Sequence, residues 1–547
     1  MYPYDLAITF ATGLIGLPAV NAAIPQIQTL SAITILSDND LAAVQSGPQT
    51  FTGFRGFYTF QFRGIRFAPQ PPRFTLSTLY EGEGDVDATK YGPGCLQGPD
   101  PRWPDLNEDC LFLNVWTPYI SANASSSTQR KKLKAVMVWL YGGGNTAGTG
   151  TDPEKEGGNL ASRGDVVVVT FNYRLGNLGF LPFNNGVNNG NYAISDMLNA
   201  LRWVRQNIAN FGGDPNRVTI WGESAGATNV RTLLAVPQIE EENLIAGAIM
   251  QSMPGEIGGY TEWDTPAVFY SRITTKVLRE SGCEGTKDEV ACLSAYDALK
   301  WFNEPGRTQA IGPTFDNNLL HTRALPLAGP LAHAHNIPVL LGTNRDELSY
   351  YFSTPSTNFT AILASISAIA GVPLTHLANS SFSPETSPAW PTYTEAQKQA
   401  AVFNASSKVA TDLLFTCLTH AFAFSASKNN VFTRSYEFVF NRTYQTPRFA
   451  DFARGVCGRD VADPDEEEYY KCHAGEVPYT FGNILQQGWP DREGLDTPFA
   501  RLIVDWWSAF ARTGRMEGEE GFLAARGFIE SEKKMSEAGV WRGMGRM

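Results

Sequence analysis

Ser224 lies at the centre of the stretch "RVTIWGESAGATNV", residues 217–230, with a glycine two positions before it and another two positions after it. A serine hydroxyl in this G-x-S-x-G pattern can act as the nucleophile of acyl transfer, although so short a match also arises by chance. The surrounding sequence is more informative. Residues 218–221 predict a buried strand and residues 227–234 predict the start of a helix, with glycines that let the chain turn sharply between them. The stretch therefore predicts a nucleophile elbow, and a small residue in an ordinary turn is the alternative.

A glycine-rich sequence, "YGGGN", follows the apolar run "AVMVWL" at residues 135–140. Gly142, Gly143 and Gly144 allow backbone N–H groups to approach a reacting carbonyl without side chains in between. Together with the N–H of Ala225, such a loop can form an oxyanion hole. A phosphate-binding loop is a competing use of glycines, but it fits poorly because neither G-K-[S/T] nor a helix-opening G-x-G-x-x-G occurs here. A flexible loop without a chemical role is the other alternative.

A serine nucleophile needs a base, and the chain offers only six histidines. In this kind of fold the order along the chain is Ser, acid, His, so the base is expected well downstream. His473, in "KCHAGEVPYTFG", follows the last clear strand and opens a glycine-containing loop, which makes it the best candidate. The others are His321, His333 and His335, which come too early, His376, which lies in a segment with helical spacing, and His420, whose apolar helical run predicts a core position.

Two neighbouring carboxylates, Asp346 and Glu347, follow an apolar run at residues 338–343. A carboxylate there can hold an imidazole in the right tautomer and stabilise the imidazolium that forms during catalysis. Spacing alone does not choose between the two, and either could be a surface charge.

Apolar runs that alternate with a helical pattern set the fold class. Nearly unbroken apolar runs are typical of strands that are covered on both faces. Residues 194–211 carry apolar side chains on one helical face, and "FGGDP" ends that helix. We expect one wound, mostly parallel α/β sheet, with its chemistry in loops beyond the carboxyl ends of the strands. The expected strands span residues 135–140, 165–171, 218–221, 244–250, 338–343 and 435–440.

The composition is that of a large globular protein. Of its 547 residues, 43% are hydrophobic and 12% aromatic, which is enough for a large core. The net charge of −12 argues against nucleic acid and anionic membranes as partners. No cysteines have the C-x-x-C spacing of a zinc site, and serine-based acyl transfer needs neither a metal nor a cofactor.

The first 22 residues predict a secretory signal peptide, because an apolar stretch is followed by small residues suited to cleavage near Ala22. An N-terminal strand is the alternative, since the amino end carries Asp5 and no Lys or Arg. No later segment approaches the ~20 apolar residues that span a bilayer, so no transmembrane anchor is expected. N-x-[S/T] sequons also favour export, and they occur at Asn123, Asn358, Asn379, Asn404 and Asn441.

Six of the seven cysteines fall into local pairs, which predict disulfides and an oxidising compartment. The remaining one, Cys417, lies in the apolar run "LLFTCLTHAFAF" and is expected to be a buried free thiol. For the last pair, a bond between Cys472 and Cys417, or three free thiols, are the alternatives. The pairs are Cys95 with Cys110, Cys283 with Cys292, and Cys457 with Cys472.

Ordered motifs from about residue 62 to residue 514 together resemble one family. They are "FRGIRFA", "YGPGCLQ", "NEDCLFLNVWTP", "YGGGNTAG", "NYRLGNLGF", "NIANFGGDPNRVTIWGESAGA", "GTNRDE", "CHAGEVPYTFG" and "FARTG". The chain resembles the type B carboxylesterases of the α/β-hydrolase fold, a group that includes cholinesterases and a set of fungal lipases. This resemblance implies one catalytic domain at residues 23–515, after a signal peptide at 1–22, and leaves the charged segment 516–547 unassigned.

The resemblance also implies roles for individual residues. Glu347, rather than Asp346, becomes the acid, and Glu223 and Glu476 support the histidine. Asn145 departs from the family, which commonly has Phe after the triple glycine, and is expected to alter the acyl pocket. The other implied positions are Ser224 as nucleophile, His473 as base, Gly143, Gly144 and Ala225 as oxyanion donors, and Cys95–Cys110 and Cys283–Cys292 as disulfides.

These observations predict a secreted carboxylic ester hydrolase that acts on small-molecule esters through an acyl-enzyme, and they leave its oligomeric state open. A lipase is one alternative, but the 14 residues between Cys95 and Cys110 are fewer than in the lid-forming loop of the fungal lipases. Trp103, in this loop, is expected to be a packing aromatic rather than a cation-binding Trp. A non-catalytic adhesion protein of the same fold is the other alternative, which the intact triad positions disfavour.

Overall fold

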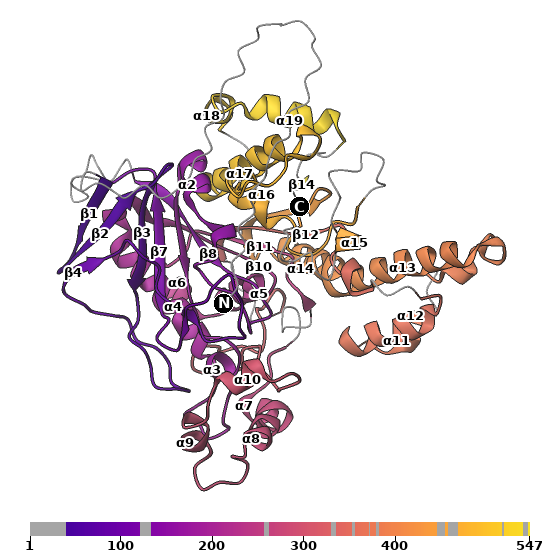
Figure 1. Ribbon diagram of the computed structural model, residues 1–547, viewed down its shortest axis with the longest axis horizontal. Helices are drawn as coiled ribbons and strands as arrows, with labels where there is room; N and C mark the ends of the chain where they lie inside the picture. Colours follow the sequence, from indigo (N-terminus) through magenta and orange to yellow (C-terminus); the bar gives the residue numbers. More distant parts are fainter. Residues whose placement is uncertain are drawn as a thin grey trace, which may run out of the picture. The chain divides into compact units, whose positions relative to one another are not determined.

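Apolar strands from the middle of the chain form a mixed sheet of twelve strands (Figure 1). The strands, as the chain runs, are β1 (Leu41–Ser46), β2 (Gln49–Arg55), β3 (Phe60–Arg66), β4 (Gly84–Asp87), β7 (Phe112–Thr117), β8 (Lys134–Leu140), β9 (Val167–Phe171), β10 (Gly213–Glu223), β11 (Gly247–Gln251), β12 (His335–Asn344), β13 (Phe432–Phe440) and β14 (Gly545–Arg546). The computed structural model describes residues 40–120, 133–255, 262–329, 335–352, 356–370, 372–378, 382–445, 454–457, 469–516, 519–539 and 545–546.

The strand order is β1-β2-β3-β7-β9-β8-β10-β11-β12-β13-β14, with β4 paired to β2. From β9 to β13 every neighbouring pair is parallel, whereas the first four pairs and the β13–β14 pair are antiparallel. Two short strands, β5 (Gly94–Cys95) and β6 (Leu106–Asn107), form a separate sheet. All six predicted strands belong to the large sheet, so the expected α/β class is confirmed.

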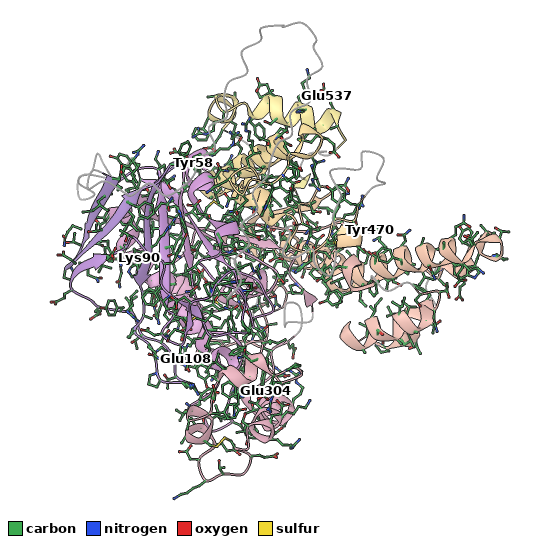
Figure 2. All side chains as sticks on the ribbon, in the orientation of Figure 1. Tyr58, Lys90, Glu108, Glu304, Tyr470 and Glu537 are labelled. Atoms are coloured by element: carbon green, nitrogen blue, oxygen red, sulfur yellow. A yellow bond between two sulfur atoms is a disulfide. The ribbon has the colours of Figure 1, made fainter. Side chains whose placement is uncertain are left out.

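The central strands are apolar because both of their faces are covered. Every residue of β9 is buried, and in β8 only Lys134 is not. In the view of Figure 1, α4 (Tyr192–Asn207), α5 (Ala225–Leu233) and α6 (Pro237–Glu241) lie on one side of these strands. On the other side lie α2 (Gly158–Gly164), α16 (Val477–Phe481) and α17 (Asp496–Thr513). Side chains fill the layers between sheet and helices, as Figure 2 shows.

The predicted helix over residues 194–211 is confirmed as α4, followed by a tighter turn at Ile208–Phe211. The remaining helices surround the sheet or extend from it. They are α3 (Gly176–Phe180), α7 (Pro266–Phe269), α8 (Thr275–Glu280), α9 (Glu289–Ser294), α10 (Leu299–Asn303), α11 (Phe359–Ala370), α12 (Leu374–Ala378), α13 (Glu395–Thr411), α14 (Cys417–Lys428), α15 (Arg454–Cys457), α18 (Glu520–Ala524) and α19 (Phe528–Glu537).

Helices α13 and α14 form one continuous helical stretch, and two sequence predictions about it are wrong. Cys417 is a free thiol, as expected, but it is exposed rather than buried. His420 is also exposed, with its Nδ1 2.5 Å from Glu437 Oε1 of β13, and is not a core histidine. The apolar run predicted full burial, but only one side of α14 packs on the protein, through residues such as Phe422 and Ala426.

By length and composition alone, the stretch Glu395–Lys428 could cross a membrane. Half of its apolar window is buried inside the protein, and one such helix is weak evidence for a membrane span.

All three predicted disulfides are present, between Cys95 and Cys110, Cys283 and Cys292, and Cys457 and Cys472. Three predicted sequon asparagines, Asn358, Asn404 and Asn441, are exposed. Asn123 and Asn379, His333 and the predicted signal peptide at residues 1–22 lie outside the described residues.

The C-terminal segment after residue 515, for which the sequence indicated no structure, continues the same compact unit that begins at Asp40. Its helices α18 and α19 lie beside α17 in Figure 1. Phe528 and Met535 of α19 are buried in the main hydrophobic core, which explains why this charged segment packs at all.

Candidate active site

Ser224 stands between β10 and α5 in a backbone conformation that few residues adopt, with φ 56° and ψ −127°. The flanking glycines were predicted to make the sharp turn, but neither has a positive φ, and the serine itself takes the strained conformation. The glycines serve close packing instead. A Cβ on Gly222 would lie 2.5 Å from the carbonyl carbon of Gly226, and one on Gly226 would lie 2.1 Å from the Leu140 oxygen. The predicted strand–turn–helix setting is confirmed.

The glycine loop after β8 lies against this turn. A Cβ on Gly142 would approach the Ser224 Cβ to 2.9 Å, so only glycine fits there. Gly143 and Gly144 have φ values of 115° and 63°, which also favour glycine. Within the described part of the chain, the N–H groups of these two residues and of Ala225 donate to no protein acceptor. The loop therefore offers unused donors beside the serine, as an oxyanion hole requires.

His473 and Glu347 are in direct contact. The His473 Nδ1 lies 2.7 Å from Glu347 Oε2, and the backbone N–H of His473 donates to the Glu347 carbonyl at 3.1 Å. Glu347 is fully buried, and its Oε1 accepts a hydrogen bond from the Asn344 N–H at 2.6 Å. This pairing occupies Nδ1, so Nε2 is the ring nitrogen left for chemistry.

Asp346, the neighbouring carboxylate, lies away from the imidazole. Its Oδ2 accepts hydrogen bonds from the Lys471 N–H at 2.9 Å and from the Arg345 side chain at 2.8 Å. The side chain therefore holds the chain just before His473, and the geometry selects Glu347 as the histidine's partner.

Glu223 approaches the other nitrogen of the imidazole. Its Oε1 lies 3.2 Å from His473 Nε2, whereas no hydrogen bond links Ser224 Oγ to His473 among the described residues. Burial raises the pKa of Glu223 to about 8, with His473 acting in the opposite direction. Burial lowers the pKa of His473, but Glu223 and Glu347 outweigh it and raise that pKa to about 9. The imidazole thus lies between two carboxyl groups, and the charges of all three groups are coupled.

Glu476 supports the site indirectly. Its Oε1 accepts from Gln251 at 3.0 Å at the end of β11, and its Oε2 accepts from Asn344 at 2.6 Å at the end of β12. Asn344 in turn donates to the carbonyl of Cys472, next to His473, at 3.0 Å. Burial raises the pKa of Glu476, with Glu347 adding to this effect. The residue joins the ends of two strands to the loop that carries the histidine.

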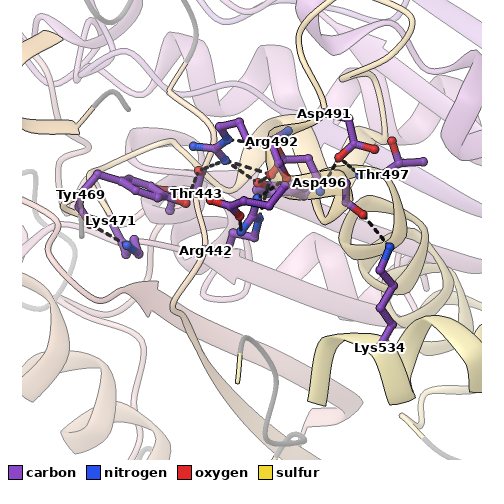
Figure 3. A network of polar contacts seen from close by, with 12 residues as sticks. Arg442, Thr443, Tyr469, Lys471, Asp491, Arg492, Asp496, Thr497 and Lys534 are labelled. Carbon is purple, nitrogen blue, oxygen red and sulfur yellow. Dashed lines mark hydrogen bonds and ion pairs between the residues drawn. The ribbon is translucent and has the colours of Figure 1, made fainter. Parts of the chain in front are cut away.

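A second anchor of the histidine loop is a buried polar network, shown in Figure 3. Asp496 accepts hydrogen bonds from Arg442 at 2.8 Å and from Arg492 at 2.9 Å, and Arg492 also donates to the Thr443 carbonyl at 2.7 Å. These contacts fix the segment after β13, from which Gln445 donates to the His473 carbonyl at 2.8 Å.

Tyr470 adds a third anchor three residues before the histidine. Its ring packs on Phe403 of α13 with centroids 4.9 Å apart, and its hydroxyl donates to Asn404 (Figure 2). The loop that carries His473 is therefore held from the sheet, from the polar network and from α13.

A cavity of about 440 Å³ is lined by several of the predicted residues. Ser224, His473, Glu223 and the loop Gly142–Gly144 all line it, together with the aromatic side chains of Trp103, Tyr141, Tyr350, Tyr351 and Phe415. This volume lies within the ordinary range for small-molecule sites. Among the described residues, no group of three or more His, Cys, Asp or Glu side chains is arranged to hold a metal ion.

Of the other histidines, those whose side chains the structure describes, His321, His335 and His420, do not line this cavity. His321 is exposed, and its Nε2 contacts the Asn318 carbonyl at 3.0 Å. His335 begins β12 and stacks on Phe432, at the amino end of the strand rather than its carboxyl end. His473, the candidate chosen from chain order, lines the cavity together with Ser224.

Asn145 does not line the cavity, contrary to its expected effect on the acyl pocket. It is fully buried, accepts a hydrogen bond from Asn229 of α5 at 2.8 Å, and donates to the Ile311 carbonyl at 2.8 Å. With a φ of 57°, it closes the glycine loop and ties it to the helix after the serine.

Trp103 is both a packing residue, as predicted, and part of the cavity wall. It is 7% exposed and lies under Arg102, whose Cζ is 4.1 Å from the ring centroid. Arg102, Asp152, Glu154 and Lys155 also line the cavity, and sequence reasoning did not find them. The only sequence signal for three of them is that residues 152–155 follow the glycine loop in the same connection after β8, and for Arg102 it is the adjacent Trp103.

The sheet and the loops at its carboxyl edge are those of an α/β hydrolase. A family profile described as "Carboxylesterase family" matches residues 49–541. Para-nitrobenzyl esterase of Bacillus subtilis (strain 168) is 31% identical over 481 residues, which cover 83% of each chain. Bile salt-activated lipase of Bos taurus is 27% identical over 483 residues, 83% of this chain and 75% of that one.

Solved structures agree with this comparison. The crystal structure of the Geobacillus stearothermophilus carboxylesterase EST55 has a TM-score of 0.65 at 26% identity, and the alignment covers 87% of this chain and 92% of that one. A structure of PNB esterase has a TM-score of 0.63 at 26% identity with the same coverage. The chain belongs to the carboxylesterase family and is a carboxylic ester hydrolase of the α/β-hydrolase fold.

Proposed function

We propose that this enzyme hydrolyses small-molecule esters through an acyl-enzyme on Ser224, with His473 as general base and Glu347 as the acid that orients it. The 2.7 Å contact between His473 Nδ1 and Glu347 Oε2, in the cavity that Ser224 lines, carries this proposal. The chain order Ser, Glu, His supports it further.

In the proposed first step, Ser224 Oγ attacks the ester carbonyl while His473 Nε2 takes the hydroxyl proton. The carbonyl oxygen becomes an oxyanion, which the N–H groups of Gly143, Gly144 and Ala225 bind. Collapse of this intermediate breaks the bond to the alcohol oxygen, and His473 returns the proton to the leaving alcohol. Water then repeats the same steps on the acyl-enzyme and releases the acid.

Glu223 has a place in this scheme. Because it directly precedes Ser224 and lies 3.2 Å from His473 Nε2, it can stabilise the imidazolium that forms when the serine proton is transferred. We assign Glu223 and Glu476 as positioning residues, which act on the ester only through the histidine.

The test uses an activated neutral ester, 4-nitrophenyl acetate, and stopped-flow detection of the released phenol. The wild-type enzyme should show turnover and a burst if deacylation is slower than acylation, and Ser224→Ala should lower kcat by about 10⁴-fold or more. A matched control is Ser252→Ala, a buried serine in the loop after β11. Turnover that survives in Ser224→Ala would refute the mechanism, and a wild-type protein with no turnover would support the non-catalytic adhesion alternative.

We also propose that the protein is exported and glycosylated. Three disulfides favour an oxidising compartment, and the exposed asparagines Asn358, Asn404 and Asn441 are accessible to a glycan. Expression in a eukaryotic host should yield enzyme in the medium whose mass falls after treatment with an N-glycosidase. Retention inside the cell with unmodified mass would contradict this proposal.

A further inference from the structure

One wall of the cavity presents hydrogen-bond donors and buries its acceptors. We call Arg102, Trp103 and Lys155 the donor wall, because each lines the cavity and each side chain only donates hydrogen bonds. The proposed hydrolysis uses none of them. They lie in the cavity that holds Ser224, so they can contact the part of an ester that does not react.

Arg102 uses only part of its guanidinium within the protein. Its Nε and Nη2 donate to Asp100 at 2.9 and 2.6 Å, whereas Nη1 donates to no group within the described residues. The guanidinium plane is held in place by the Trp103 ring, 4.1 Å from its Cζ. Its partner Asp100 does not line the cavity, so of this ion pair only the arginine lines it.

Lys155 likewise uses only part of its hydrogen-bonding capacity on an aspartate. Its Nζ donates to Asp152 Oδ2 at 2.6 Å, and no other bond from this amine occurs in the part of the chain that the structure describes. An ammonium has three N–H groups, so two of them are available. Lys155 and Glu223 act on each other's pKa, which places the amine within electrostatic reach of the elbow at Ser224.

Trp103 packs beside one of the two cations, Arg102. Trp103 is 7% exposed, and its indole Nε1 has no hydrogen-bond partner among the described residues. This N–H is itself out of contact with solvent, so Trp103 contributes to the wall by packing under Arg102.

The acidic partners are less accessible than the cations. The side chain of Asp152 is 2% exposed and both of its oxygens accept bonds within the protein, from Lys155 and from the Glu154 N–H. Glu154 is 8% exposed, whereas the Arg102 and Lys155 side chains are 25% and 22% exposed. A ligand in the cavity therefore meets the N–H donors of this wall more readily than its carboxylates.

We propose that the donor wall binds a carboxylate carried by the ester substrate, away from the ester group that reacts. A carboxylate has only acceptor atoms, so it can take hydrogen bonds from Arg102 Nη1 and Lys155 Nζ, the unused donors of two cations that both act on Asp152. A cationic ester would instead meet two positive charges on this wall, where both oxygens of Asp152 already accept hydrogen bonds. This inference names the substrate class and rests on the proposed ester hydrolysis at Ser224.

The experiment compares esters that differ only in this charge. On the alcohol side, the pair is 4-acetoxybenzoate and 4-acetoxybenzamide, and on the acyl side it is the monomethyl ester of adipic acid and methyl adipamate. The readout is the ratio of kcat/KM for the carboxylate over that for its amide. We expect a ratio of at least about tenfold in one of the two pairs for the wild-type enzyme, as a charge-assisted bond would give.

Variants then test whether the donor wall causes the preference for the carboxylate ester. Arg102→Gln and Lys155→Gln should each lower the preferred ratio by about tenfold. The matched control is Lys134→Gln, since Lys134 is similarly exposed and pairs with Asp165 at 2.8 Å, but begins β8 at the opposite end from the glycine loop. This control should keep the wild-type ratio.

Stability is controlled separately, because Lys155→Gln leaves a buried aspartate without its partner. The double variant Lys155→Gln/Asp152→Asn removes both charges and should show the same loss of preference. Turnover of the neutral amides reports the triad itself, so failure of the proposed hydrolysis is seen independently. Ratios near one in both wild-type pairs, or a ratio that survives in Arg102→Gln and in the double variant, would overturn the carboxylate site.

Discussion

At the scale of single residues, the adjacent carboxylates Asp346 and Glu347 have different roles. Glu347 contacts the imidazole, whereas Asp346 binds the backbone of Lys471 and the side chain of Arg345. Glu347→Gln should lower kcat by about 10³- to 10⁴-fold with little loss of folding, because an amide cannot stabilise the imidazolium. Asp346→Asn is the matched control and should lower kcat by about tenfold at most, since an amide oxygen still accepts from Lys471. Steady-state kinetics decides, and the reverse ranking would make Asp346 the acid.

The third carboxylate, Glu223, should control the pH at which the enzyme becomes active. His473 is a base only when neutral, so kcat/KM for a neutral ester should rise with pH through a pKa above the ordinary histidine value. Glu223→Gln removes a negative charge 3.2 Å from Nε2, which disfavours the imidazolium and lowers this pKa. The rising part of the profile should therefore move to lower pH.

The control for this shift is Glu537→Gln, at the exposed end of α19 in Figure 2, which should leave the profile in place. A profile that does not move in Glu223→Gln would show that Glu223 does not interact with the charge on the histidine.

At the scale of elements, the sequence located the residues of the candidate site wherever a residue follows a buried strand. Ser224 follows β10, Glu347 follows β12, and the glycine loop follows β8, each at a carboxyl end. Apolar runs specify such strands because parallel strands are covered on both faces. Chain order then selected His473, which lies more than thirty residues beyond β13, after a segment that is only partly described.

Reasoning from sequence patterns failed where one pattern is compatible with two different structures. The apolar run around Cys417 fits a buried helix, but α14 buries only one side and leaves Cys417 and His420 exposed. Asn145 takes the place of an expected pocket residue, yet its amide binds Asn229 inside the protein. The donor wall could not be foreseen, because the pairing of Arg102 and Lys155 with aspartates depends on side-chain placement rather than on periodicity.

The disulfide between Cys457 and Cys472 links α15 to the histidine loop. Both sulfurs are buried, and Cys472 directly precedes His473. By chain entropy, a loop of this size stabilises the fold by about 3 kcal/mol. Because the triad needs the imidazole held to within about 0.5 Å, Cys457→Ala/Cys472→Ala should lower kcat/KM by about tenfold at temperatures where the protein is still folded.

The matched control is Cys283→Ala/Cys292→Ala, which removes a disulfide whose residues do not line the cavity. It should lower the melting temperature and leave kcat/KM unchanged below the transition. Circular dichroism and kinetics on the same samples separate the two effects. Equal activity in both variants would show that the 457–472 bond serves stability alone.

At the scale of the whole molecule, the sheet brings its strand ends to one cavity, and the short loop between Cys95 and Cys110 closes one wall of that cavity. This wall is fixed rather than free to open. Besides the disulfide, Gln97 donates to the Gly148 carbonyl and accepts from the Gly148 N–H, both at 2.8 Å, so the loop is tied to the glycine loop. A lipase that is activated at an oil surface needs a cover that moves, and this loop lacks that freedom.

We therefore expect no interfacial activation. The rate on a short-chain ester such as tributyrin should rise smoothly with concentration and show no jump at the solubility limit. Gln97→Ala is the informative variant, because it removes both bonds to Gly148 and gives the loop more freedom, and it should lower activity on dissolved ester rather than raise activity on emulsion. A sharp increase of the wild-type rate on emulsified tributyrin would contradict a fixed wall and favour the lipase alternative.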